Sequence, residues 1–189
     1  MQRNKLPYIL YIASTALFLI SIILVPFLQM GNNPLAAKAY PLYHLGCHQI
    51  NSRSLCIFLR GGTYSLEDCT KDSSVLDWRM TPTVEKDDAI GYKLPVCARD
   101  VGIYTGLLVG GLLFPLFGRV ERKEIPPPWL FVILLMPMAI DGTSQLLTLY
   151  ESSNIVRILT GLTAGVVVPF YLIPILNEFY TVFFEVRKA

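Results

Sequence analysis

The sequence predicts an all-α integral membrane protein, a four-helix bundle that forms a single membrane domain over residues 1–189. Two observations predict this fold. Residues 8–29, 101–117, 129–149 and 158–180 are apolar runs of the length needed to cross a bilayer core of about 30 Å, which takes ~20 helical residues. Hydrophobic residues make up 53% of the chain and charged residues only 16%. A soluble domain of this size would not carry four such runs.

The first run, residues 8–29, is longer than the apolar part of a removable signal peptide and lacks a small-residue cleavage site. We therefore expect it to remain as a helix in the lipid bilayer. It is followed by a long, nearly charge-balanced segment, residues 31–99, which we expect to be a loop outside the cytoplasm.

Basic residues predict the orientation of the helices. The short segments beside the runs carry Arg3, Lys5, Arg119, Arg122, Lys123, Arg187 and Lys188. In the turn between the third and fourth runs, residues 150–157, the only charged residues are Glu151 and a terminal Arg157. Because an excess of Lys and Arg in short loops marks the cytoplasmic side, both termini are predicted to be cytoplasmic. The net charge of +2 reflects this pattern and gives no reason to expect nucleic acid as a partner.

The second and fourth runs carry glycines at intervals of four residues. These are Gly102, Gly106 and Gly110 in the second run, and Gly161 and Gly165 in the fourth. Small residues at this spacing let helix backbones approach closely within a membrane. We therefore expect these two helices to pack against each other along their glycines.

Residues that can bind a metal lie at both ends of the long loop. Its first end holds both histidines of the chain beside a cysteine, and its second end holds a cysteine three residues before an aspartate. Thiolate, imidazole and carboxylate are the ligands of zinc, and Cys/His sites also suit iron or copper. The expected ligands of a transition metal, zinc first, are Cys47, His48, Cys97 and Asp100, with His44 as a replacement or supporting residue.

The four cysteines also have a simpler interpretation, because an even number of cysteines outside the cytoplasm indicates disulfides. For Cys56 and Cys69, inside the loop, we favour a disulfide. For Cys47 and Cys97 the sequence leaves metal binding and a disulfide about equally supported, and the neighbouring histidines favour the metal.

Asp141 lies inside the third run, where an ionisable residue costs at least ~2.5 kcal/mol on insertion scales. It should therefore face the bundle interior and have a partner there. The topology brings other polar residues to the same outer depth, and the candidates for a catalytic site are Asp141, Arg99, Arg157, Gln145 and Asn154. The alternative is a purely structural role, in which Asp141 forms a buried ion pair with Arg157 or Arg99 that fixes the register of the helices.

Two groups of motifs resemble a known family. The first comprises Cys47-His48-Gln49, Arg53-Ser54 and the run from Leu94 to Gly106, in which residues 95–100 read Pro-Val-Cys-Ala-Arg-Asp. The second comprises Asp141-Gly142-x-x-Gln145, Glu151 to Arg157 and Thr160-Gly161. Together they are similar to a family of small prokaryotic multi-pass membrane proteins of unknown function. The resemblance implies a four-helix membrane protein without an established activity.

The chain departs from the pattern of that family in two places. Asp100 stands where the family often has a cysteine, which keeps metal binding feasible but removes a Cys-x-x-Cys dithiol. Residues 61–92, which include Cys69, resemble an insertion.

Three classes of function follow from these residues. The first is a membrane metalloprotein, acting on a lipid-like or small substrate if it is an enzyme, with Asp141 as general base and Arg99 or Arg157 stabilising negative charge. The second is a thiol redox protein that uses Cys47 and Cys97. The third is a transporter or an accessory subunit with membrane-protein partners. No nucleophile–base pair is recognisable, so we predict the metal site without assigning catalysis.

Overall fold

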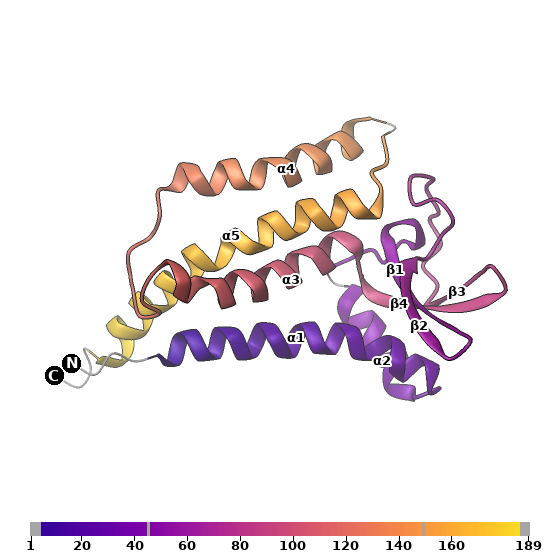
Figure 1. Ribbon diagram of the computed structural model, residues 1–189, viewed down its shortest axis with the longest axis horizontal. Helices are drawn as coiled ribbons and strands as arrows, with labels where there is room; N and C mark the ends of the chain where they lie inside the picture. Colours follow the sequence, from indigo (N-terminus) through magenta and orange to yellow (C-terminus); the bar gives the residue numbers. More distant parts are fainter. Residues whose placement is uncertain (1–4, 45, 149, 186–189) are drawn as a thin grey trace.

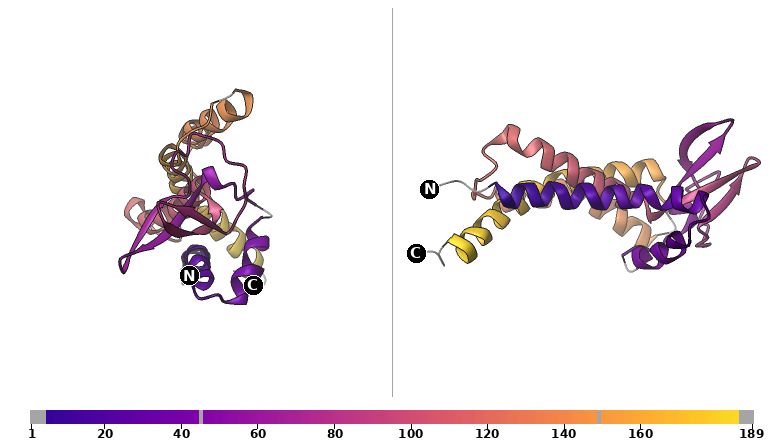
Figure 2. Two further views of the ribbon diagram at one scale, coloured as in Figure 1. Left: turned by 90° about the vertical axis from the view of Figure 1, so that its right-hand side faces the viewer. Right: turned by 90° about the horizontal axis from the view of Figure 1, so that it is seen from below.

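The computed structural model describes residues 5–44, 46–148 and 150–185, which form five α-helices and a four-stranded antiparallel sheet (Figure 1). The long helices lie side by side, and the sheet lies across one end of them, here called the sheet end (Figures 1 and 2). The start of the first helix and the end of the last lie at the opposite end. Arg3, Arg187 and Lys188, on which the orientation prediction partly depends, lie outside the described residues.

Four of the helices are long and apolar enough to cross a membrane. They are α1 (Leu6–Met30), α3 (Ala98–Leu113), α4 (Pro128–Leu147) and α5 (Asn154–Tyr180). A 3-10 turn, η2 (Phe114–Phe117), extends α3, and a π-helical turn, η3 (Thr181–Glu185), extends α5. Helices α1 and α5 cover their apolar runs completely, α3 covers its run together with η2, and α4 ends at Leu147, within the predicted run 129–149.

The glycines of α3 and α5 bring these two helices into close contact, as their spacing predicts. A Cβ atom at Gly106 would lie only 2.6 Å from the carbonyl oxygen of Leu162 and 2.8 Å from the Cα atom of Gly165. Gly102, Gly110 and Gly161 meet backbone atoms of the opposite helix in the same way. The prediction that the second and fourth apolar helices pack along their glycines is confirmed.

The helices α1 and α4 lie on opposite sides of this central pair (Figure 1). The hydroxyl of Tyr11 on α1 donates a hydrogen bond of 2.8 Å to the carbonyl of Leu107 on α3, and Tyr11 packs with Phe114 and Ile173. Of the residues in α4, only Asp141 is buried. The apolar side chains of α4 therefore point mainly outward, as expected for a helix surrounded by lipid.

The prediction of an all-α protein is wrong, because the segment between α1 and α3 contains a sheet. Its strands are β1 (Ser54–Arg60), β2 (Thr63–Asp68), β3 (Thr83–Lys86) and β4 (Ala89–Cys97), in the order β2-β1-β4-β3. A short helix, α2 (Pro34–His44), and a 3-10 turn, η1 (Asn51–Arg53), precede the sheet. The chain is thus a mixed α and β protein.

The strands are hard to recognise in the sequence because they are short and contain unfavourable residues. Pro95 and Gly91 lie in β4, and both residue types are depleted in central strands. Gly91 is required there, since a Cβ atom at this position would lie 2.6 Å from a ring carbon of Phe58. The predicted disulfide between Cys56 and Cys69 is present and joins β1 to the residue that follows β2.

A small apolar core attaches the sheet to the helices. It consists of Ile22 from α1, Leu55 from β1, Leu94 and Val96 from β4, and Ala98 from α3. The chain passes directly from β4 into α3, so that Cys97 ends the strand and is the N-cap of the helix. This junction holds Cys97 at the boundary between the sheet and the bundle.

Candidate functional site

Three residues with metal-ligating side chains meet at the junction of β4 and α3. The ligand atoms of Cys47, Cys97 and Asp100 all lie within 4.8 Å of one another, and we call these residues the thiol cluster. The thiol of Cys97 donates a hydrogen bond of 3.0 Å to Oδ2 of Asp100. The Sγ atom of Cys47 accepts the backbone N–H of Cys97 at 3.1 Å. Neither Cys47 nor Cys97 is in a disulfide.

Gln49 holds the backbone around Cys47 in an unusual conformation. Its φ of 53° lies in the left-handed region, which non-glycine residues rarely adopt. In this conformation its backbone N–H points to Cys47 Sγ at 3.5 Å. Its buried side-chain amide donates to the carbonyl oxygens of Tyr40 on α2 and Pro95 on β4, at 2.9 and 2.8 Å. These two hydrogen bonds fix the loop that carries Cys47 between a helix and a strand.

A fully buried lysine lies behind this loop. Lys93 on β4 donates hydrogen bonds to the backbone carbonyl of Gln49 at 2.6 Å and to Oδ1 of Asn51 at 2.9 Å. Burial lowers the pKa of Lys93 to about 8, and the nearby Cys47 and Asp77 oppose this shift. A cationic Lys93 therefore favours negative charge in the thiol cluster.

The two thiols of the cluster differ in acidity. A hydrogen bond with the side chain of Cys97 lowers the pKa of the Cys47 thiol, and the hydrogen bond from the backbone N–H of Gln49 lowers it further. The same hydrogen bond and burial raise the pKa of the Cys97 thiol well above its ordinary value. Cys47 is thus the residue of the pair that ionises first, while Cys97 keeps its proton.

The two histidines lie beside the thiol cluster but are not part of it. His44 and His48 are both exposed, and their ring centroids are 6.5 Å apart. The ring Nδ1 of His44 lies 3.1 Å from the backbone carbonyl of Cys47. Among the described residues, the predicted ligands therefore divide into three that meet and two that remain at the surface.

The predicted catalytic residues belong to a separate group of buried and half-buried polar and charged residues, here called the ion-pair network. Its members are Arg53, Arg99, Asp141, Gln145, Glu151, Ser152, Asn154 and Arg157. Asp141 forms an ion pair with Arg99, which confirms one of the two pairings expected for it. Gln145, one turn away on α4, donates to Oδ2 of Asp141 at 2.9 Å. Ser152 reaches the same oxygen at 3.4 Å.

Arg157 joins the network to the turn between α4 and α5. Its side chain is 2% exposed and forms an ion pair with Glu151. It also donates to Oδ1 of Asn154 at 2.9 Å and to Oε1 of Gln145 at 3.3 Å. The α4 and α5 helices are thereby joined by charged groups that have little contact with water.

Asn154 connects the first turn of α5 to the sheet. Its side-chain amide donates to Oδ1 of Asp68 at 3.0 Å and to the carbonyl of Ser54 at 3.3 Å, and its backbone N–H donates to Ser73 at 3.2 Å. Asn154 therefore holds the sheet against the bundle, a role that the sequence did not indicate.

Five further residues of the site were not selected from the sequence. Arg53, Glu151 and Ser152 complete the ion-pair network, while Gln49 and Lys93 support the thiol cluster. Arg53, Gln49, Glu151 and Ser152 belong to the motifs that carry the family resemblance, which was a usable signal. Lys93 had none, because its burial depends on a sheet that was not foreseen.

Comparison with known proteins shows the family to which the chain belongs. A family described as "Predicted membrane protein (DUF2085)" matches residues 89–171. An uncharacterised protein of Methanocaldococcus jannaschii is 35% identical over 177 residues, covering 90% of this chain and 93% of that protein. The chain belongs to this family of predicted membrane proteins. A second uncharacterised protein, from Methanothermobacter thermautotrophicus, is 37% identical over 79 residues, covering 40% of this chain and 67% of its own.

The resemblance stated from the motifs is confirmed at this level, that of a membrane protein family with uncharacterised archaeal relatives. The family match begins at the start of β4 and extends into α5. It therefore includes Cys97, Asp100 and most of the ion-pair network but not Cys47. No solved structure matches the chain.

Proposed function

We propose that this member of the family is a metal-binding membrane protein, in which Cys47, Cys97 and Asp100 hold one transition metal ion. Zinc is the first candidate for this ion. The observation that carries the proposal is the convergence of three ligand atoms, within 4.8 Å of one another, from two segments fifty residues apart. Because His44 and His48 lie outside this group, we propose three protein ligands and one open position.

The donor set suits zinc. A tetrahedral zinc ion with bonds of about 2.0–2.3 Å places its ligand atoms roughly 3.3–3.8 Å apart, a separation compatible with the thiol cluster. Two thiolates and one carboxylate favour zinc over magnesium or calcium, and iron or copper remain the alternatives. Three protein ligands with an open fourth position are typical of catalytic rather than structural zinc sites.

The surrounding residues would support such an ion by charge and by hydrogen bonds. Two thiolates and a carboxylate carry three negative charges, one more than a zinc ion neutralises. The buried ammonium group of Lys93 supplies a compensating positive charge behind Gln49. The N–H groups of Gln49 and Cys97 point to Cys47 Sγ and would orient its thiolate.

When bound, a zinc ion in this position would polarise an oxygen of a substrate or lower the pKa of a water molecule. We propose a positioning role for the ion-pair network instead of a direct one. Asp141 accepts hydrogen bonds from Arg99, Gln145 and Ser152, so its carboxylate is engaged rather than available as a general base. Through Arg99, which neighbours Asp100 in the sequence, the network would orient the start of α3.

We propose that the sheet end faces the outside of the cell. The basic residues Arg119, Arg122 and Lys123 lie in the α3–α4 connection, at the end of the bundle opposite the sheet (Figure 1). This arrangement fits a cytoplasmic location for that end. The disulfide between Cys56 and Cys69 fits an oxidising compartment for the sheet.

Elemental analysis of the purified protein in detergent tests the metal site. We expect about one zinc, iron or copper ion per chain in the wild type, and a large loss of metal in Cys47→Ser, Cys97→Ser and Asp100→Asn. His48→Ala is the matched control, because His48 is exposed and lies outside the thiol cluster; it should keep its metal. A metal-free wild type, or equal metal content in all variants, contradicts the proposal.

The second candidate is a thiol redox protein, and the adjacency of two free thiols with different acidity favours it. In that case Cys47 and Cys97 would reduce a disulfide of a partner protein: the two thiols form the Cys47–Cys97 disulfide, and the two sulfur atoms of the partner take up the two electrons and two protons. Alkylation of free thiols after denaturation without reductant separates the two functions. Two free thiols per chain, found in protein that contains metal, would support the metal site. The absence of free thiols in protein without metal would support the redox function.

A further inference from the structure

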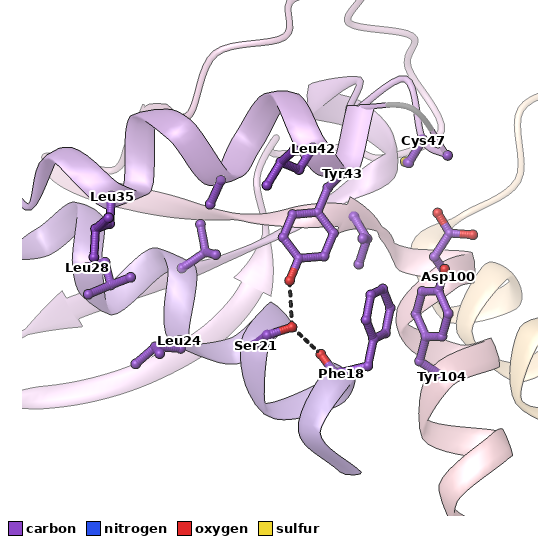
Figure 3. A pocket seen from close by; sticks show the side chains of 14 residues that line it. Phe18, Ser21, Leu24, Leu28, Leu35, Leu42, Tyr43, Cys47, Asp100 and Tyr104 are labelled. Carbon is purple, nitrogen blue, oxygen red and sulfur yellow. Dashed lines mark hydrogen bonds between the residues drawn. The ribbon is translucent and has the colours of Figure 1, made fainter. Parts of the chain in front are cut away.

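A cavity of about 460 Å³ lies beside the thiol cluster, between α1, α2 and the start of α3 (Figure 3). Its volume falls within the range of sites that bind small molecules. Aliphatic side chains form most of its wall, and they are contributed by Leu24, Val25, Leu28, Leu35, Leu42 and Val96. The cavity therefore offers an apolar surface next to the proposed metal ligands.

The polar groups of the cavity are gathered at one end. Cys47, Asp100 and Tyr104 lie there, away from Leu28 and Leu35 at the other end (Figure 3). The hydroxyls of Tyr43 and Ser21, between these ends, satisfy each other. Ser21 donates to the carbonyl of Phe18 at 2.6 Å, so the 2.6 Å contact between the hydroxyls must use the proton of Tyr43. The hydroxyl protons of Tyr43 and Ser21 are therefore both used within the protein and are not offered to a ligand.

This division of apolar and polar surface suits an amphiphile with one hydrocarbon chain. A sugar, nucleotide or peptide would leave polar groups without hydrogen-bond partners along the leucines, which is unfavourable. The cavity also lies where the apolar helices meet the sheet, since its lining includes Phe18 of α1, Leu35 of α2 and Val96 of β4. Leu35 and Leu42 are 57% and 70% exposed, so the apolar lining continues onto the surface of the protein.

We propose that this cavity binds the hydrocarbon chain of a single-chain lipid, with an oxygen-bearing head group such as a carboxylate at Cys47 and Asp100. Cys47 and Asp100 are acidic groups and would repel a carboxylate on their own, whereas a metal ion held by them would accept one at its open position. The inference rests on the proposed metal site for the head group only. The chain is held by the leucines, whether or not a metal is bound.

Photolabelling with a diazirine-bearing palmitic acid tests the proposal, with the full chain in phosphatidylcholine nanodiscs. We expect adducts concentrated on residues 21–43 of the wild type. Leu28→Trp, which fills the cavity, should reduce them about thirtyfold, because excluding two or three buried methylene groups costs about 2 kcal/mol. Leu17→Trp is the matched control; Leu17 lies on α1, is 70% exposed and does not line the cavity, so this variant should label like the wild type.

Adducts that spread evenly along the lipid-facing helices, or that are the same in both tryptophan variants, would overturn the proposal. If Leu28→Trp does not elute as a single species with the Cys56–Cys69 disulfide intact, Leu35→Trp on α2 provides the same test. Labelling should also fall when the metal is removed by a chelator. Labelling that is lost in Leu28→Trp but unchanged by the chelator and by Cys47→Ser would support the binding site for the hydrocarbon chain. The same result would reject the metal-bound head group.

Discussion

Arg53 and Glu151 are 98 residues apart in the sequence and form a two-point ion pair across the junction of the sheet and the bundle. Nε of Arg53 lies 2.7 Å from Oε1 of Glu151, and its NH2 lies 2.9 Å from Oε2. Glu151 also pairs with Arg157. One carboxylate thus joins the turn before the sheet, the α4–α5 turn and the start of α5.

Removing this carboxylate should destabilise the protein strongly. Glu151→Gln leaves two arginines with an uncompensated positive charge, and removing one partner of a buried ion pair costs about 3–5 kcal/mol. Thermal unfolding in detergent should therefore show a clear fall in Tm. Lys123→Ala is the control, because Lys123 and Glu178 form an exposed pair worth about 0–1 kcal/mol. Equal effects of the two substitutions would show that the network adds no stability.

The contact between α3 and α5 should not tolerate a side chain at Gly106. Gly106→Val would force a Cβ atom to 2.6 Å from the carbonyl of Leu162, and overpacking of this kind costs about 1–3 kcal/mol. Gly142→Ala is the matched change, because a Cβ atom there meets only Arg99, at 3.6 Å. We expect a lower Tm for Gly106→Val and an unchanged or higher one for Gly142→Ala. The reverse order would exclude close packing along these glycines.

Lys93 should make the stability of the protein rise with pH in an alkaline window. Its pKa is lowered by burial to about 8, from an ordinary value of 10.5. Between these two pH values the unfolded chain keeps a proton that the folded protein has lost, so the free energy of unfolding increases with pH. Below about pH 8 Lys93 is protonated in both states, so it no longer makes the stability depend on pH.

The measurement is the difference in Tm between the wild type and Lys93→Met across pH 7.5–10.5. Taking this difference cancels the titration of groups common to both proteins. A wild-type curve that runs parallel to that of Lys93→Met throughout would mean that Lys93 does not change its protonation in this window.

The Cys56–Cys69 disulfide should stabilise the sheet independently of the thiol cluster. Removing a disulfide that closes a loop of this length costs about 3 kcal/mol. We expect the double variant Cys56→Ser/Cys69→Ser to be cleaved faster by an added protease between β1 and β4, with its metal content unchanged. Loss of metal in this variant would show that the sheet and the thiol cluster do not act independently.

Part of the site could be predicted from the sequence and part could not. Asp141 had to find a buried partner because a carboxylate within an apolar helix is costly, and Arg99 was one of the two arginines at its depth. The grouping of Cys47 with Cys97 and Asp100 also followed from the ends of one loop. The exclusion of His44 and His48 did not, because it depends on the direction of each side chain after α2 ends at His44.

The fold shows the same division. The sequence by itself determined the four apolar helices, the contact between α3 and α5, and the Cys56–Cys69 disulfide. Apolar length, glycine spacing and cysteine number are properties that can be read along the chain. Only the tertiary structure decided that residues 54–97 form a sheet, that Lys93 is buried behind Gln49, and that Arg53 meets Glu151. These features depend on hydrogen bonds and ion pairs between residues far apart in the chain. A local sequence pattern does not specify which distant residue will be the partner.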